Sequence, residues 1–183
     1  MRVGGASHPF RIKNPGVGRQ KYKMKMNTRD LTLVVIFAAL YAALVYVFAP
    51  ISFLALQFRV AGVIRPAIAK KWILAIGYAL GVVVGNLSSP NIGHLELLFM
   101  PTMSLIAGLL GHVIAKRFNN NYFICGAIMA TVISLSVAWM LTNFGLPFLA
   151  TFPYLLISEQ IVCLIGSVVF KMLETRFMWW ETQ

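Results

Sequence analysis

The stretch LTLVVIFAALYAALVYVFAP, residues 31–50, decides the fold of this chain. It is apolar and uncharged from Leu31 to Ala49, and as a helix it is long enough to cross a hydrocarbon core of about 30 Å. Pro50 ends it, because proline interrupts the hydrogen bonding of a helix. Further apolar stretches follow, separated by short polar gaps. We therefore expect an all-α integral membrane protein in a lipid bilayer.

The composition of the whole chain agrees with a membrane location. Of its 183 residues, 59% are hydrophobic and 11% are charged, and the mean hydropathy is +0.78. A soluble domain of this size needs more polar surface to face water. The net charge of +11 does not indicate nucleic-acid binding, because the basic residues lie in one N-terminal stretch and at the ends of apolar spans.

The positions of the basic residues predict a topology. Half of the sixteen Lys and Arg residues precede Leu31, and most others cluster in every second gap, at Lys70–Lys71, at Lys116–Arg117 and around Lys171. Cytoplasmic loops of membrane proteins carry such an excess of positive charge. The pattern predicts a bundle of six transmembrane helices in the plasma membrane, with both termini cytoplasmic. Five spans, with the second stretch re-entrant, would reverse the later clusters.

The membrane domain is expected to cover residues 30–176. A basic tail at 1–29, which we expect to be disordered, precedes it, and a short cytoplasmic tail at 177–183 follows. The six spans are expected at about 31–49, 58–69, 72–87, 95–115, 122–143 and 152–172.

Two of these spans carry unusual residues. The second contains Arg65, which we expect to snorkel to the cytoplasmic headgroups rather than to bind a ligand. In the third, Gly77, Gly81 and Gly85 repeat every four residues. This spacing of small residues permits close contact with another helix.

Polar residues gather at the outer half of the expected bundle and predict a pocket there. They are Arg59, Asn86, His94, Glu96, Asn143 and Glu159. An ionisable side chain inside a bilayer costs on the order of 2.5 kcal/mol or more, so each such residue needs a partner or a function.

Glu159 is the strongest of these candidates, because it lies about two turns inside the sixth span, about 10 Å below the outer interface. We favour a ligand contact over the alternative, a structural pair with Arg59. Glu96 stands at a helix start, where a carboxylate complements the helix dipole, so a structural role fits it equally well. Asn86 and Asn143 stand at helix ends and can cap them or read the donor–acceptor edge of a ring.

No metal or cofactor site is indicated. His94 and Glu96 lie two residues apart, without the HExxH spacing of a zinc site. Cys125 and Cys163 lie in apolar stretches without a CxxC motif, and we expect them to pack as small hydrophobic side chains.

The first span also presents small residues. Ala38, Ala39, Ala42 and Ala43 form two overlapping AxxxA repeats on neighbouring positions. Such a face lets another helix approach closely. The approaching helix can belong to a partner subunit or to this chain, and the spacing alone fits both.

Several strings together resemble one transporter family. They are TRDL at 28–31, FAALYAAL at 37–44, APISF at 49–53, QFRV at 57–60, GNLSSP at 85–90 and the Ser158–Glu159 pair. Over residues 26–173 the chain resembles the substrate-binding S-component of energy-coupling factor (ECF) transporters, of the QueT type associated with queuosine precursors. It departs from the family pattern at 60–63, where VAGV stands and family members commonly carry an acidic residue.

The resemblance implies a six-helix bundle that captures a small metabolite at its outer face. It also implies that the alanine face of the first span docks onto a transmembrane coupling subunit, which is bound to two ATPases. The implied ligand is heteroaromatic, a deazapurine whose amine would pair with Glu159 and whose ring edge would meet Asn86, Asn143 or Arg59. Because the chain has no GxxxxGK(S/T) phosphate loop, we expect ATP hydrolysis in the partners and no enzymatic activity here.

Other functions stay open from sequence alone. An S-component for another vitamin fits the same residues. A stand-alone secondary transporter is expected to show an internal repeat, which is not visible in these spans. A small intramembrane enzyme would use Glu96, Glu159 and His94 as acid–base groups, but no nucleophile motif or metal spacing accompanies them.

Overall fold

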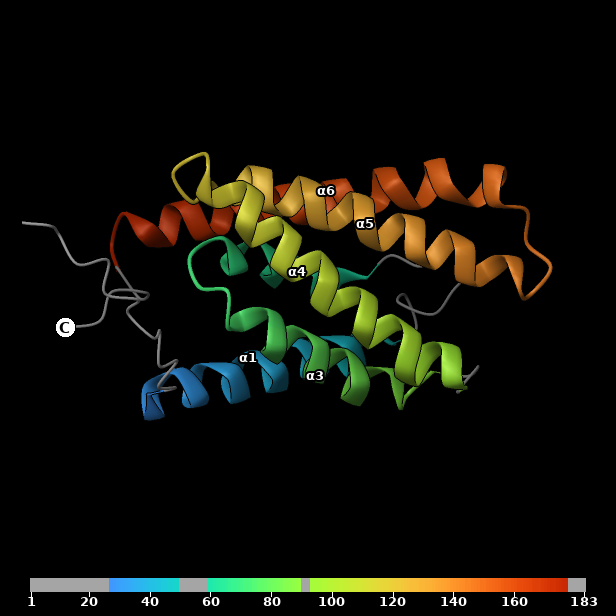
Figure 1. Cartoon of the computed structure of the whole chain (residues 1–183), viewed down its shortest axis with the longest axis horizontal. Coiled ribbons are helices and arrows are strands. Elements are labelled where there is room, and N and C mark those ends of the chain that lie inside the picture. The colour runs from blue at the N-terminus through green and yellow to red at the C-terminus, as the bar shows by residue number, and fades with distance from the viewer. Residues whose placement is uncertain (1–26, 50–58, 90–92, 178–183) are drawn as a thin grey trace, which may run out of the picture.

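The part of the chain that the structure describes consists of helices joined by short turns (Figure 1). The computed structural model describes residues 27–49, 59–89 and 93–177. In chain order the elements are α1 (Thr28–Val47), η1 (Val60–Ala69), α3 (Leu74–Asn86), η2 (Leu95–Phe99), α4 (Met100–Lys116), α5 (Tyr122–Thr142) and α6 (Phe148–Glu174). η1 is a 3-10 helix, and η2 is a π-helical turn that leads directly into α4. The predicted all-helical class is confirmed for these residues.

Four helices are long and apolar enough to cross a membrane. They are Thr28–Val47, Leu95–Lys116, Tyr122–Thr142 and Phe148–Glu174. η1 and α3 have only 10 and 13 residues. At the rise of their helix types each measures about 20 Å, short of a hydrocarbon core of about 30 Å. These two helices replace the second and third expected spans, so the count of six spans stays a prediction.

The predicted helix limits differ most from the observed ones at α6. This helix begins at Phe148 and contains Pro153, whereas the sequence predicted a start at residue 152. A proline so near the start of a helix removes one backbone hydrogen bond without ending the helix. The expected N-terminal tail lies outside the described residues up to residue 26, and α1 already begins at Thr28. Of the expected C-terminal tail, only residue 177 is described.

The glycine stripe of α3 packs against α1, as its spacing predicted. A Cβ atom at Gly77 would lie 2.7 Å from the Val34 carbonyl oxygen, and one at Gly81 would lie 2.9 Å from the Ala38 carbonyl oxygen. Gly85 meets the Val45 side chain in the same way. Only residues without a side chain allow the two backbones to approach this closely.

η1 occupies the centre of the bundle. Each long helix packs against the next one in the chain, from α1 through α3, α4 and α5 to α6, and η1 contacts all five. Figure 1 shows it as the teal segment between α6 and α3, behind α4. A Cβ atom at Gly166 of α6 would overlap the Val63 carbonyl group, so a glycine lets η1 lie against that helix. η1 is therefore a core element rather than a helix that faces lipid.

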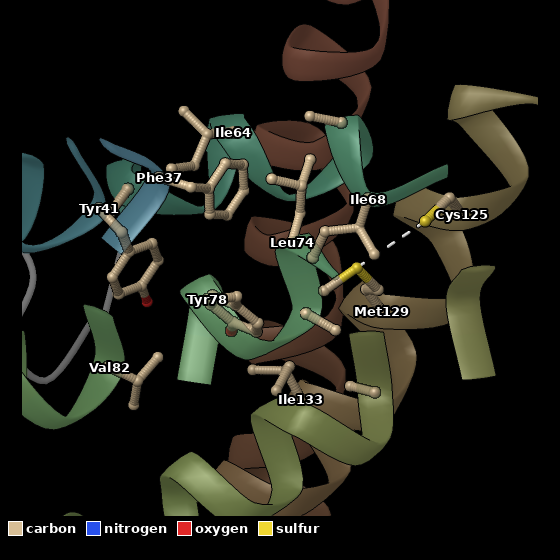
Figure 2. Packing of buried hydrophobic residues seen from close by; sticks show 14 of the residues in the cluster. Phe37, Tyr41, Ile64, Ile68, Leu74, Tyr78, Val82, Cys125, Met129 and Ile133 are labelled. Atoms are coloured by element: carbon tan, nitrogen blue, oxygen red, sulfur yellow. Dashed lines mark hydrogen bonds between the residues drawn. The ribbon is translucent and has the colours of Figure 1, made fainter. Parts of the chain in front are cut away.

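The apolar core surrounds η1 on the side of α3 and α5. Ile68 of η1 lies among Leu74, Met129 and Ile133, all nearly inaccessible to solvent (Figure 2). Cys125 and Cys163 are free and buried, which confirms the packing role predicted for them.

The basic clusters of the described residues lie at one end of the bundle, which we call the basic end. The turn after η1 supplies Lys70, which pairs with Glu174 at 2.6 Å, and Lys71, which pairs with Asp30 at 3.0 Å. These pairs hold the end of η1 to the end of α6 and to the start of α1. Lys116, the last residue of α4, and Arg117, its C-cap, lead into the turn between α4 and α5, which lies at the same end (Figure 1).

Candidate functional site

An ion pair lies inside the bundle, away from solvent. Nη1 of Arg65, in η1, donates to Oε2 of Glu159, in α6. The exposed fraction is 0% for the arginine side chain and 4% for the glutamate. Two charges persist in such surroundings only as a close pair. Glu159 therefore has a partner, and this partner is Arg65 rather than Arg59.

Arg65 lies between a glycine and two tyrosines. A Cβ atom at Gly62 would lie 3.1 Å from Cζ of Arg65, so the missing side chain makes room for the guanidinium. Cζ of Arg65 lies 5.3 Å from the centroid of the Tyr78 ring, within the range of a cation–π interaction. Tyr78 contacts Tyr41 edge to face, with the ring centroids 5.0 Å apart (Figure 2). We call Tyr41, Gly62, Arg65, Tyr78 and Glu159 the inner cluster.

The inner cluster contains hydrogen-bond donors that no described residue satisfies. Nε and Nη2 of Arg65 and the hydroxyl group of Tyr41 are buried without a partner. Each unpaired buried donor costs about 1–3 kcal/mol, and such groups are rare in folded proteins. The inner cluster is therefore a candidate binding site as well as a structural contact.

The expectation that Arg65 snorkels to the headgroups is wrong. It assumed that the second helix lies near the surface of the bundle, where a long side chain can extend along apolar neighbours to the interface. In the structure five helices surround η1, and Arg65 is completely buried. Its side chain has no path to the headgroups and is neutralised by Glu159 instead.

A second polar group, which we call the outer cluster, lies at the ends of helices opposite the basic end. It comprises Arg59, Asn86 and Glu96, each at most 4% exposed. Nδ2 of Asn86 donates to the Glu96 backbone oxygen at 2.8 Å and joins the end of α3 to η2. Among the described residues, Oε2 of Glu96 has no hydrogen-bond partner and no ion pair reaches Arg59. One buried carboxylate oxygen is thus left open, in a π-helical turn, a feature frequent at functional sites.

The two other predicted site residues, His94 and Asn143, are exposed. Nδ2 of Asn143 lies 3.2 Å from the Met140 carbonyl oxygen and 3.4 Å from that of Trp139, which makes it a cap of α5. The structure therefore brings Asn86 and Glu96 together and pairs Glu159 with Arg65. It leaves His94 and Asn143 at the surface of the bundle.

The alanine face of α1 is divided between two environments. Ala42 is buried, and the Ala38 carbonyl oxygen is in contact range of Gly81 in α3. Ala39 and Ala43 are exposed. One AxxxA repeat thus packs inside the bundle, and the other is exposed on the described part of the chain.

Comparison with known protein families decides the assignment. The sequence model of the family described as QueT transporter matches residues 31–175, most of the chain. The chain belongs to the QueT transporter family. No curated protein and no solved structure matches it. The match confirms the QueT-type resemblance found in the sequence, and with the four long apolar helices it establishes a transmembrane transport protein.

Both polar clusters contain buried hydrogen-bonding atoms without a partner among the described residues, in an otherwise apolar interior. The sequence singled out Glu159 and the residues of the outer cluster as candidates, but it did not indicate the open donors of Arg65 and Tyr41. One signal was available for Arg65. The carboxylate of Glu159 needs a cation, and the second expected span contains two arginines, Arg59 and Arg65. Nothing in the sequence indicated a hydrogen-bonding role for the Tyr41 hydroxyl group, because tyrosine is a frequent residue of membrane proteins.

Proposed function

We propose that this QueT transporter is the substrate-binding subunit of an ECF importer for a small heteroaromatic micronutrient, a queuosine precursor. The single observation that carries the proposal is a charged cluster with open donors, buried in the core of a chain from this family. A purely structural ion pair would gain from satisfying every donor. A ligand that supplies the missing acceptors gives these groups a purpose.

The proposed binding residues are those of the two clusters. Glu159 and Arg65 form the inner part, and Arg59, Asn86 and Glu96 form the outer part, with His94 and Asn143 at the surface. The proposed orientation places the basic end in the cytoplasm, since positive charge is retained on that side. The outer cluster then faces the compartment from which the solute arrives.

We further propose that the exposed half of the alanine face contacts the transmembrane coupling subunit, which is bound to two ATPases. Ala39 and Ala43 share a helix face with Ile36 and Leu40. The latter two line an apolar groove of about 290 Å³ between α1 and α6. Small residues beside an apolar groove permit close approach of a partner helix.

The partner contact is tested with substitutions on the two halves of this face. Ala39→Trp and Ala43→Trp should abolish uptake and pull-down of the coupling subunit while ligand binding by the purified chain is retained. Ala42→Trp, on the buried half, should reduce the yield of folded protein. Normal complex formation by both exposed variants would assign the face to another role.

The substrate class is tested by extracting the native protein and identifying the small molecule that co-purifies with it. We expect a deazapurine, released on denaturation and detected by mass spectrometry. If a different vitamin co-purifies, the proposed substrate is wrong, but the proposal of an ECF importer stands. Solute uptake driven by a proton or sodium gradient, in vesicles that contain this chain alone, would contradict the ECF proposal and indicate a secondary transporter.

A further inference from the structure

The inner cluster is electrically balanced before any ligand arrives. Arg65 and Glu159 carry one charge each and contact each other, and no further ion pair between described residues involves either of them. A third charge in this apolar interior would find no counter-charge, and an uncompensated buried charge is costly. A ligand ammonium group beside Glu159 would compete with Arg65 and leave the cluster positive. The structure therefore disfavours the amine contact expected from the sequence.

The open atoms of the cluster indicate a different kind of contact. Nε and Nη2 of Arg65 and the Tyr41 hydroxyl group are donors for which the described part of the chain supplies no acceptor. Glu159 accepts from Arg65 through Oε2, and a carboxylate has sites for further donors. The guanidinium is a rigid planar fork, which fits the edge of a flat ring. A ring edge with a carbonyl oxygen beside N–H groups would satisfy both partners without adding charge.

We propose that Arg65 contacts the ligand together with Glu159, and that the pair reads an uncharged carbonyl and N–H edge of a heteroaromatic ring. The guanidinium and the Tyr41 hydroxyl donate to the carbonyl oxygen, and the carboxylate accepts from the ring N–H groups. Any ammonium substituent of the ligand lies outside the inner cluster. This inference rests on the proposed function and adds to it the class of ring edge that is selected.

Three ring probes test the proposal by calorimetry on the purified full-length chain. 7-Deazaguanine carries the carbonyl and N–H edge, 7-deazaadenine has the same ring with that edge changed, and 7-aminomethyl-7-deazaguanine adds an ammonium group. We expect 7-deazaguanine to bind at least about tenfold more tightly than 7-deazaadenine, because a site built for hydrogen bonds rejects an analogue that leaves them unmade. Removal of the aminomethyl group should weaken binding less than about tenfold, since that group makes no contact with the ion pair.

Arg65→Lys keeps the charge but removes the planar fork. It should reduce the preference for 7-deazaguanine over 7-deazaadenine to about threefold or less. Lys70→Gln, which removes a cation from the other end of η1, is the matched control and should leave the preference unchanged. If Arg65→Lys does not fold, Tyr41→Phe serves in its place, because it removes one open donor and keeps the ring; it should weaken 7-deazaguanine binding about threefold or more.

Two results would overturn the inference, and a third would remove the proposed function. If the aminomethyl probe binds strongly and 7-deazaguanine does not bind, Glu159 contacts the ammonium group. The proposal of an importer would still stand. Wild-type selectivity in a folded Arg65→Lys variant, or unchanged binding by Tyr41→Phe, would return both residues to a structural role. If the folded wild-type chain binds none of the three probes, the queuosine-precursor class fails, and this inference fails with it.

Discussion

Two ion pairs hold η1 and the turn after it to α6, and they differ in burial. Arg65 and Glu159 are 0% and 4% exposed, whereas Lys70 and Glu174, at the basic end, are 10% and 32% exposed. Arg65 lies in η1, Lys70 directly follows this helix, and both carboxylates belong to α6. The two pairs therefore allow a comparison of a buried and a partly exposed contact between the same two parts of the fold.

The comparison teaches that the two pairs serve different purposes. Lys70 and Glu174 are partly exposed, so solvent screens their pair more than the buried one, and we expect it to act as a weaker clamp. The buried pair must offset the desolvation of both charges, and replacing such pairs with apolar residues is often neutral or stabilising. A buried pair that also leaves donors open points to a function beyond stability.

The largest expected effect comes from breaking the buried pair on one side only. Arg65→Met leaves Glu159 without a counter-charge and should destabilise the protein by about 3–5 kcal/mol. The double variant Arg65→Met with Glu159→Leu should recover most of this loss, because no unpaired charge remains. Unfolding in detergent, followed by circular dichroism, measures both variants. A double variant as unstable as the single one would mean that the pair itself contributes net stability.

A smaller effect is expected where η1 lies against α6. Gly166→Ala introduces a methyl group that overlaps the Val63 carbonyl, and overpacking of this kind costs about 1–3 kcal/mol. The displaced η1 should also misplace Arg65 and weaken ligand binding. Val169→Ala, at an exposed position of α6, is the control for a change in the same helix. Wild-type stability in Gly166→Ala would show that the two helices are less closely packed than described.

The smallest effect is expected at the basic end. Glu174→Gln should reduce stability by less than about 1 kcal/mol, and the loss should shrink further in 1 M salt, because exposed pairs are screened. Thermal unfolding at low and high salt measures this dependence. A loss as large as that of Arg65→Met would erase the distinction between the two pairs.

The sequence predicted those features that depend on local pattern. Apolar length identified the long helices, the spacing of Gly77, Gly81 and Gly85 predicted their contact with another helix, and the QueT-type strings identified the family. Each of these signals is contained in a short stretch of residues. The proposed site residues, the six-span count and the cytoplasmic termini stay predictions.

The sequence could not predict what depends on tertiary packing. The interpretation of Arg65 failed because its partner Glu159 lies 94 residues away in the chain, and local pattern does not show which of two arginines meets it. The central position of η1 was hidden for a related reason. Its residues are apolar on most positions, as a lipid-facing helix would also be, and only the contacts of the folded bundle show that five helices enclose it.

One measurement tests the central claim, that the buried carboxylate of α6 serves a ligand, most directly. Binding of 7-deazaguanine to the purified chain is compared by calorimetry between Glu159→Gln and Glu174→Gln, which remove the same charge from the same helix. We predict no detectable binding by folded Glu159→Gln and wild-type affinity for Glu174→Gln. Wild-type affinity in both variants would contradict the claim and assign the Arg65–Glu159 pair to the structure alone.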